Sequence, residues 1–240
     1  MYPWRCVVCG QAFTAHQATC TGCFETGSLL RIGQRPAAEI DAVPEVTDAH
    51  ALAKAAWTIV PLSSYPGLRL GKGALVTIYG PPGSGKSSFA TRALDGLRGP
   101  VVFLSSEEGP GPSLHDRLAR CRVRRPDFVV VSRASVDQVV DIVRTRRAIG
   151  LVVDSVQVAS FTAEDLRHVL AVLPSLAVLI AVAQVNKRGE IEGRERLLHE
   201  ADVVLRCTTM RWALEKSRYQ PIGLSGAVLE EKVEVSDAVD

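Results

Sequence analysis

The stretch that decides the fold runs from residue 74 to residue 97 and reads ALVTIYGPPGSGKSSFATRALDGL. Its first six residues are mostly apolar and partly β-branched, which predicts a buried strand over Ala74–Tyr79. Its second half has apolar residues at helical spacing, which predicts a helix over Lys86–Leu97. Glycine and proline fill the space between them. The stretch therefore predicts a strand, a tight glycine-rich loop and a helix in direct succession.

The loop itself fits the pattern G-x-x-x-x-G-K-[ST] from Gly80 to Ser87. Its glycines let the backbone wrap closely around a phosphate, and the N–H groups at the start of the helix donate to it. We expect Lys86 to reach the β- and γ-phosphates of ATP and Ser87 to bind Mg²⁺. The predicted nucleotide-binding residues are Gly80, Pro81, Pro82, Gly83, Ser84, Gly85, Lys86, Ser87 and Ser88.

Outward from this loop, apolar runs alternate with helical patterns. The predicted strands are Ala74–Tyr79, Val101–Leu104, Phe128–Val131, Leu151–Val153 and Val178–Ala183. The predicted helices are Lys86–Leu97, Ser113–Cys121, Val136–Arg147 and Ala163–Leu173. Such alternation predicts an α/β fold whose mainly parallel sheet is covered on both faces. At one edge of the sheet we expect antiparallel strands over Val203–Cys207, Arg211–Glu215 and Ala227–Val235.

Three of the predicted strands end in polar residues, at the edge where ligands bind in parallel sheets. Asp154 is expected to hold Mg²⁺ opposite Ser87, and Glu107 to deprotonate the attacking water. Gln184 is expected to sense the γ-phosphate. Each residue also has a plain reading, as a turn cap, a solvated acidic turn or a satisfied polar group. Glu108, next in the chain, is the other candidate for the catalytic carboxylate.

Four cysteines near the N-terminus form two C-x-x-C pairs that are ten residues apart: Cys6, Cys9, Cys20 and Cys23. Four thiolates at this spacing predict a closed, tetrahedral and structural Zn²⁺ site. Disulfides or free thiols are the alternatives. His16 lies between the pairs and is expected to be a bystander, and Cys121 and Cys207 are expected to be small buried apolar residues.

The composition fits a cytoplasmic globular protein. The chain has 240 residues, 47% hydrophobic and 22% charged, and its net charge of +2 gives no bulk attraction to nucleic acids or membranes. No apolar leader follows Met1, so we expect the cytoplasm, where cysteines stay reduced. The expected parts are a zinc-binding module over 1–30, a linker over 31–56 and an ATPase core over 57–240.

On these residues the chain resembles the RadA (Sms)-type RecA-like ATPases. The cysteine module, the linker, the phosphate loop and the strand of Asp154 come in the order that those proteins use. LSSEE at 104–108 is similar to the family's strand that ends in Gly-Glu-Glu, and NKRGEIEG at 186–193 to its loop after the sensor strand. KSRY at 216–219 is similar to its Lys-Asn-Arg-Phe signature. AQVN at 183–186 is more similar to the sensor of DnaB-type helicases.

The resemblance implies a RecA-like fold and a DNA-dependent ATPase that acts in recombination, repair or branch processing, with a translocase or helicase as one form of it. It implies that Glu107 is the catalytic glutamate, and that Lys216 and Arg218 reach the γ-phosphate on a neighbouring subunit of a hexameric ring. RadA proteins carry a further Lon-protease-like domain, so we expect a truncated member. In such a ring, residues after Gln184 touch single-stranded DNA: Lys187, Arg188, Arg194 and Arg196.

Two other functions remain open at this point. One is a KaiC-like regulatory ATPase that does not use DNA, and the other is a nucleotide-binding zinc scaffold with negligible hydrolysis. For the charged segment after Gln184, a solvated loop is the alternative to a DNA-binding role. Arg117, Arg120 and Arg124 could share a helix face as a second nucleic-acid surface, or simply be a solvated helix end.

Overall fold

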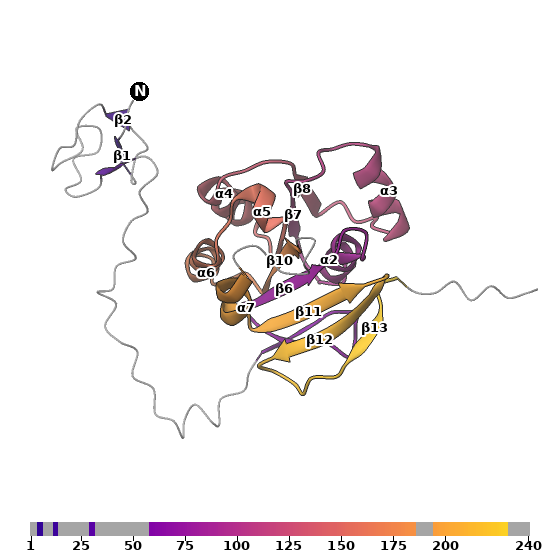
Figure 1. Cartoon of the computed structure of the whole chain (residues 1–240). Helices are drawn as coiled ribbons and strands as arrows, with labels where there is room; N and C mark the ends of the chain where they lie inside the picture. Colours follow the sequence, from indigo (N-terminus) through magenta and orange to yellow (C-terminus); the bar gives the residue numbers. More distant parts are fainter. Residues whose placement is uncertain (1–3, 7–11, 14–28, 32–57, 186–193, 230–240) are drawn as a thin grey trace, which may run out of the picture. The chain divides into compact units, whose positions relative to one another are not determined.

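The structure is a computed structural model of the whole chain (Figure 1). It describes residues 4–6, 12–13, 29–31, 58–185 and 194–229. The chain divides into two units, Met1–Ala55 and Ala56–Asp240, which are described separately. None of the helices in the described part of the chain is long and apolar enough to cross a membrane.

In the first unit, three short strands form an antiparallel sheet in the order β2-β1-β3. They are β1 (Trp4–Cys6), β2 (Ala12–Phe13) and β3 (Leu29–Arg31). Cys6 is the last residue of β1, whereas Cys9, Cys20 and Cys23 lie outside the described residues. No group of three or more possible metal ligands occurs among the residues that the structure describes. The predicted zinc module and the boundaries of the linker therefore stay predictions.

The second unit is built on an eight-stranded sheet in the order β13-β12-β11-β6-β10-β9-β7-β8. The strands are β6 (Ala74–Gly80), β7 (Val101–Ser105), β8 (Phe128–Val131), β9 (Gly150–Asp154), β10 (Val178–Gln184), β11 (Val203–Thr208), β12 (Arg211–Ser217) and β13 (Ser225–Ala227). The strands from β6 to β11 pair in parallel, which confirms the predicted mainly parallel sheet.

The edge after β10 differs from the prediction. Strand β11 was expected to be antiparallel, but it runs parallel to β6 and continues the parallel part of the sheet. Only the pairs β11–β12 and β12–β13 are antiparallel. The reason is the short helix α7 (Arg194–Glu200), which returns the chain to the starting edge of the sheet before β11 begins. Residues 230–235 of the predicted last strand lie outside the described residues.

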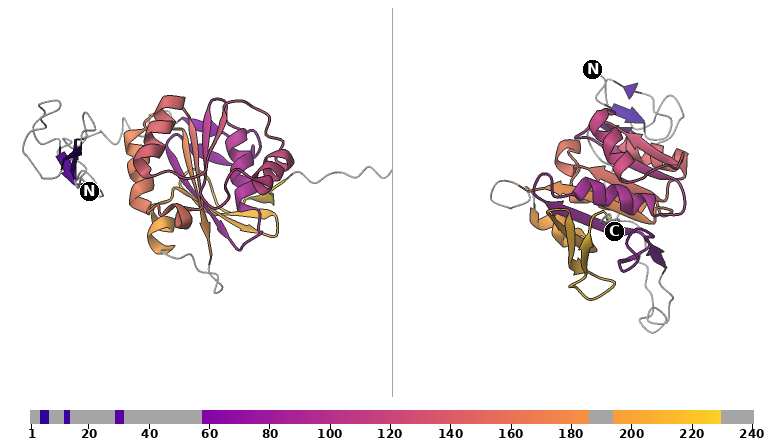
Figure 2. Two further views of the ribbon diagram at one scale, coloured as in Figure 1. Left: turned by 90° about the horizontal axis from the view of Figure 1, so that it is seen from above. Right: turned by 90° about the vertical axis from the view of Figure 1, so that its right-hand side faces the viewer.

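Helices cover both faces of this sheet (Figure 2). On one face α2 (Lys86–Asp95) packs against Val76 and Ile78 of β6, and on the other α4 (Val136–Arg146), α6 (Ala163–Val172) and α7 cover Leu75 and Tyr79. Alternate residues of one strand thus enter two separate cores, as expected for a strand that is buried on both faces. Two other helices, α3 (Pro112–Arg120) and α5 (Val156–Ala159), follow β7 and β9.

A small hairpin before the phosphate loop was not predicted. Strands β4 (Ile59–Pro61) and β5 (Arg69–Gly71) pair antiparallel, and the turn between them carries Tyr65. The Tyr65 ring stacks on Phe89 of α2 with centroids 4.1 Å apart, and Trp212 of β12 meets both rings edge-on. The Tyr65 hydroxyl donates to the Val228 carbonyl at 2.7 Å. These contacts fix the hairpin and the β12 edge on either side of α2.

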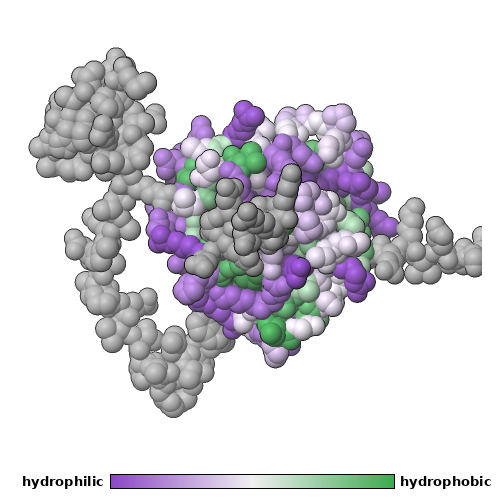
Figure 3. Space-filling view, in the orientation of Figure 1, coloured by the Kyte–Doolittle hydropathy of each residue, from purple (hydrophilic) through white to green (hydrophobic). Residues whose placement is uncertain are grey.

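Polar side chains dominate the face of the molecule drawn in Figure 3, with small apolar areas between them. Large apolar side chains that are exposed in the described part of the chain include Ile59, Val158, Val172, Met210 and Ile222. Met210 is the one among these five that faces the cavity described next.

Candidate functional site

The loop between β6 and α2 makes tight turns and packs closely against β11, and its three glycines make this possible. Gly83 and Gly85 have φ values of 73° and 97°, in the left-handed region that favours glycine. A Cβ atom on Gly80 would lie 2.1 Å from the carbonyl oxygen of Cys207 on β11, so only glycine fits there. The loop ends at Gly85, the residue before α2, and the N-terminus of this helix faces the cavity.

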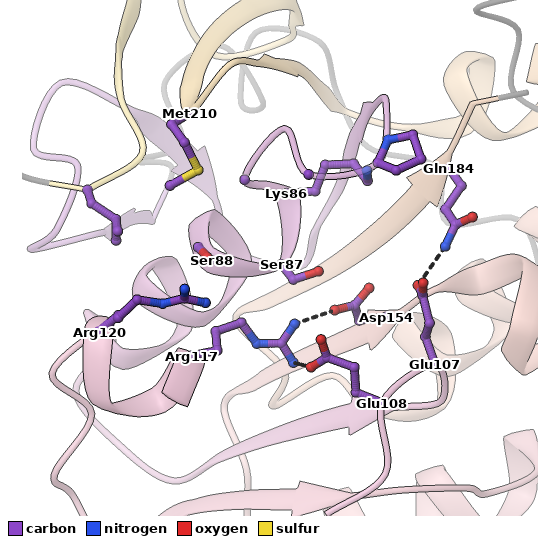
Figure 4. A pocket seen from close by; sticks show the side chains of 14 residues that line it. Lys86, Ser87, Ser88, Glu107, Glu108, Arg117, Arg120, Asp154, Gln184 and Met210 are labelled. Carbon is purple, nitrogen blue, oxygen red and sulfur yellow. Dashed lines mark hydrogen bonds and ion pairs between the residues drawn. The ribbon is translucent and has the colours of Figure 1, made fainter. Parts of the chain in front are cut away.

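An open cavity of about 610 Å³ lies over this loop (Figure 4). Its lining comes from the loop, from the carboxyl ends of three parallel strands, from α3 and from the β12 edge. The lining residues are Pro82, Gly83, Gly85, Lys86, Ser87, Ser88, Glu107, Glu108, Arg117, Arg120, Asp154, Gln184, Met210 and Leu229. Of the predicted nucleotide-binding residues, Gly80, Pro81 and Ser84 belong to the loop but do not line this cavity. Lys86, Glu107, Asp154 and Gln184, predicted separately, are all brought together here.

The ammonium group of Lys86 is held by the loop itself. Its Nζ donates to the carbonyl oxygens of Gly80 at 2.9 Å and Pro81 at 2.8 Å. Burial lowers the pKa of Lys86, and the charge of Asp154 acts in the opposite direction. The lysine is therefore pre-positioned at the mouth of the loop, where a phosphate oxygen could replace these carbonyl groups as its partner.

Asp154 ends β9 and is only 3% exposed. Burial raises the pKa of its carboxyl group, while a hydrogen bond from Ser87 and the charge of Arg117 lower it. Ser87 and Asp154 thus lie side by side as a hydroxyl and a carboxylate, which are hard oxygen ligands of the kind that Mg²⁺ prefers. The Asp154 carbonyl also accepts hydrogen bonds from the N–H groups of Ser106 at 2.7 Å and Glu107 at 3.4 Å.

The two glutamates after β7 have different surroundings. Glu108 is engaged by α3: the Ser113 hydroxyl donates to its Oε1 at 3.0 Å, and Arg117 Nη2 lies 2.9 Å from its Oε2. Glu107 is exposed, and its Oε2 accepts a hydrogen bond from Gln184 Nε2 at 2.6 Å (Figure 4). The carboxylate of Glu107 thus has a neutral amide as its side-chain partner, whereas the carboxylate of Glu108 contacts a hydroxyl and a guanidinium.

Arg117 was expected on a helix surface, and that expectation is wrong. Its side chain is only 6% exposed, and its guanidinium lies between Glu108 and Asp154, with Nη1 3.5 Å from Asp154 Oδ2. The same group lies over the Phe103 ring at 5.3 Å from its centroid. Leu114, Arg117 and Cys121 are buried at helical spacing, so an arginine in an apolar stripe was the signal in the sequence. Arg120 and Arg124 are exposed, as expected.

Two predicted site residues are not near this cavity. Lys216 Nζ donates to the carbonyl groups of Leu198 and His199, and Arg218 Nε lies 3.4 Å from Asp202 Oδ1. The Asp202 N–H donates to the Leu75 carbonyl on β6. Leu75 is five residues before Gly80, which places Asp202 roughly 16 Å along the strand from the phosphate loop. Both residues therefore lie at the opposite end of the sheet, because β12 runs antiparallel to β11.

The predicted DNA-binding residues are described only in part. Lys187 and Arg188, and the side chain of Arg194, lie outside the described residues. Arg196 is exposed on α7, and its guanidinium pairs with Glu164 of α6.

The far end of the cavity was missed by the sequence analysis. Met210, at the tip of the β11–β12 hairpin, donates its N–H to the Ser84 carbonyl at 3.1 Å, and its own carbonyl accepts from Val228 at 2.8 Å. Met210 and Leu229 thereby give this end of the cavity two apolar walls beside Ser88. No pattern in the sequence relates a hairpin tip to a loop more than a hundred residues earlier.

The buried guanidinium leads to a stability prediction. Replacing Arg117 by methionine should lower the free energy of unfolding by about 3–5 kcal/mol, because Glu108 and Asp154 lose their shared cation in a buried site. The exposed Arg120 on the same helix is the matched control, and Arg120→Met should change the value by less than about 0.5 kcal/mol. Urea denaturation followed by circular dichroism measures both. Equal stability of the two variants would contradict the proposed pairing.

Comparisons with known proteins bear on the fold. Neither a search of protein-family models nor a search of curated proteins finds a match. Among solved structures, the chain is similar to the crystal structure of a KaiC-like protein from the hyperthermophilic archaeon Pyrococcus horikoshii OT3. The TM-score is 0.52 at 19% sequence identity, over 70% of this chain and 93% of that protein. The core of the chain therefore has the same α/β fold as that KaiC-like protein.

Proposed function

We propose that this chain binds ATP in the cavity over the loop 80–87 and hydrolyses it. The water oxygen attacks the γ-phosphorus, the bond to the β–γ bridging oxygen breaks, and ADP and phosphate leave. Glu107 accepts the proton of the water, Lys86 neutralises charge on the phosphates, and Gln184 contacts the γ-phosphate. Ser87 and Asp154 would hold Mg²⁺, which when bound neutralises charge on the β- and γ-phosphate oxygens.

One observation supports hydrolysis over binding alone: the carboxylates of Glu107 and Glu108 have different partners. Binding alone needs the loop, Lys86 and Ser87, but it does not need a carboxylate outside the Arg117 ion pairs. Glu107 is exposed, and its carboxylate accepts a hydrogen bond from the neutral amide of Gln184. Such a carboxylate can accept a proton from water without the loss of an ion pair.

Replacing the two glutamates should therefore have different effects on kcat and stability. Glu107→Gln should lower kcat by about 100-fold or more, since the general base is lost, while ATP binding is retained. Glu108→Gln should lower kcat by less than about 10-fold and reduce stability, because its loss leaves Arg117 with Asp154 alone. Steady-state phosphate release measures kcat, and Lys86→Ala gives the blank. A larger loss of kcat in Glu108→Gln than in Glu107→Gln would reverse the assignment.

We propose single-stranded DNA as the polymer partner, in a role in recombination, repair or branch processing. The support is the resemblance to RadA proteins together with the position of Gln184, which contacts Glu107 and lies two residues before the basic segment 186–196. A polymer bound there would act directly on the sensor of the cavity. The structural similarity favours a second function, a KaiC-like regulatory ATPase without DNA.

Stimulation by DNA separates these two functions. Single-stranded DNA should raise kcat several-fold at low salt, and the effect should fade at moderate salt because the contacts are to backbone phosphates. The paired variant Lys187→Ala, Arg188→Ala should lose the stimulation and keep the basal kcat. A kcat for ATP hydrolysis that is the same with and without DNA would favour the regulatory ATPase. Turnover no higher than that of Lys86→Ala would favour the nucleotide-binding scaffold.

We also propose that the chain works as a ring, with hexamers as the expected form. Lys216 and Arg218 lie too far from their own cavity to serve it, which supports a role at the γ-phosphate of a neighbouring subunit. Arg218→Ala and Lys86→Ala should each be inactive alone. An equimolar mixture of the two should regain part of the wild-type kcat, since some interfaces combine an intact loop with an intact arginine. A mixture as inactive as its components would argue against action between subunits.

For the N-terminal unit we propose a structural Zn²⁺ site of Cys6, Cys9, Cys20 and Cys23, supported by the spacing of the cysteines. Purified protein should hold about one zinc per chain by atomic emission, a ratio that follows from four thiolates closing one tetrahedral site. Cys20→Ser should lose most of this metal and keep Lys86-dependent turnover. If full-length protein is purified without zinc and is fully active, the zinc site is contradicted, and disulfides or free thiols remain as the state of the four cysteines.

A further inference from the structure

The side chain of Gln157 pairs with the backbone of Gln184. Gln157 lies on α5, immediately after β9, and is half-buried. Its Nε2 donates to the Gln184 carbonyl at 3.1 Å, and its Oε1 accepts from the Gln184 N–H at 3.2 Å. One side-chain amide thus makes both hydrogen bonds that a neighbouring peptide group would make in a sheet.

The pairing of Gln157 with Gln184 begins where β9 ends. Strand β10 pairs with β9 only as far as Val182 opposite Asp154, and the chain that forms β9 then leaves the sheet and enters α5. On its other side β10 still pairs with β6, up to Gln184 opposite Gly80. Gln157 therefore extends the β9 side of the ladder by a side chain. Gln157 on one side and β6 on the other thus hold the backbone of Gln184 at the point where the strand ends.

The fixed backbone in turn directs a side chain into the cavity. Gln184 Nε2 donates to Glu107 Oε2 at 2.6 Å, so the contacts run without a gap from Gln157 through Gln184 to Glu107. Gln157 itself is not among the residues that line the cavity. Its effect on the cavity is therefore indirect, through the direction in which the Gln184 amide points.

We propose that Gln157 is a positioning residue for the hydrolysis step: it holds Gln184 so that the amide of Gln184 sets the orientation of Glu107. This inference rests on the proposed ATPase function. Loss of Gln157 thus affects the chemical step and leaves nucleotide affinity intact.

The decisive variant is Gln157→Met, which keeps the length of the side chain and removes both hydrogen bonds. We expect kcat to fall roughly 10- to 100-fold, as for other small misplacements of reacting groups, and KM for ATP to stay within about 2-fold. Affinity for a fluorescent ATP analogue should be unchanged. Gln157→Glu keeps the acceptor for the Gln184 N–H but places a carboxylate against its carbonyl, so kcat should fall as well.

The matched control is Gln220→Met. The Gln220 side chain also bonds to a backbone group, since its Oε1 accepts from the Arg69 N–H at 2.7 Å, but it does not line the cavity. Gln157→Met removes two side-chain-to-backbone hydrogen bonds, and Gln220→Met removes one. A merely structural role of Gln157 predicts that both variants lower the melting temperature, Gln157→Met more than Gln220→Met, and that both leave kcat unchanged.

A double-mutant cycle completes the test. In a Gln184→Ala background, Gln157→Met should cause no further loss of kcat, because the amide that it positions is gone. Losses that multiply, or a Gln157→Met enzyme with wild-type kcat, would overturn the proposal while the ATPase function stood. Wild-type turnover no higher than that of Lys86→Ala would instead overturn the proposed function itself, and the positioning role with it.

Discussion

The carboxyl end of β9 ties together the elements that surround the cavity. The side chain of Asp154 is hydrogen-bonded to Ser87 at the start of α2 and faces the guanidinium of Arg117 on α3. Its backbone carbonyl accepts from Ser106 and Glu107, so the turn after β7 is fixed by the same residue. One buried aspartate thus joins the phosphate loop, the helix α3 and the glutamate turn. A shift of Asp154 would move all three at once.

The charges that line the cavity are balanced before any ligand enters. Lys86, Arg117 and Arg120 stand against Glu107, Glu108 and Asp154. A triphosphate therefore cannot be bound by side-chain charge alone. In the proposed ATP complex, the N–H groups of the loop, the N-terminus of α2 and a divalent cation at Ser87 and Asp154 would supply the remaining attraction. Arg117 compensates Glu108 locally, so it adds little to the field that a nucleotide would feel.

The sequence predicted the parallel sheet and the residues at its carboxyl ends because those features are local. A β-branched run predicts a strand, and Asp154, Glu107 and Gln184 directly follow such runs. The burial of Arg117 was missed because an arginine-rich helix end looks like a surface, although its helical spacing from Leu114 and Cys121 was a signal in the sequence. The parallel direction of β11, the contact of Met210 with the loop and the pairing of Gln157 with Gln184 all depend on how distant segments meet. Residue spacing holds no information about such meetings.

The close fit between the phosphate loop and the β11–β12 hairpin limits how this fold can change. Gly80 leaves no room for a side chain against Cys207, and a Cβ on Gly85 would lie 2.9 Å from the Met210 sulfur. The Met210 N–H is also bonded to the loop carbonyl of Ser84. A loop and a hairpin taken from two different relatives would therefore clash or separate. In chimaeras, and in evolution by recombination of segments, we expect the two pieces to be exchanged together, although Gly85 and Met210 lie far apart in the sequence.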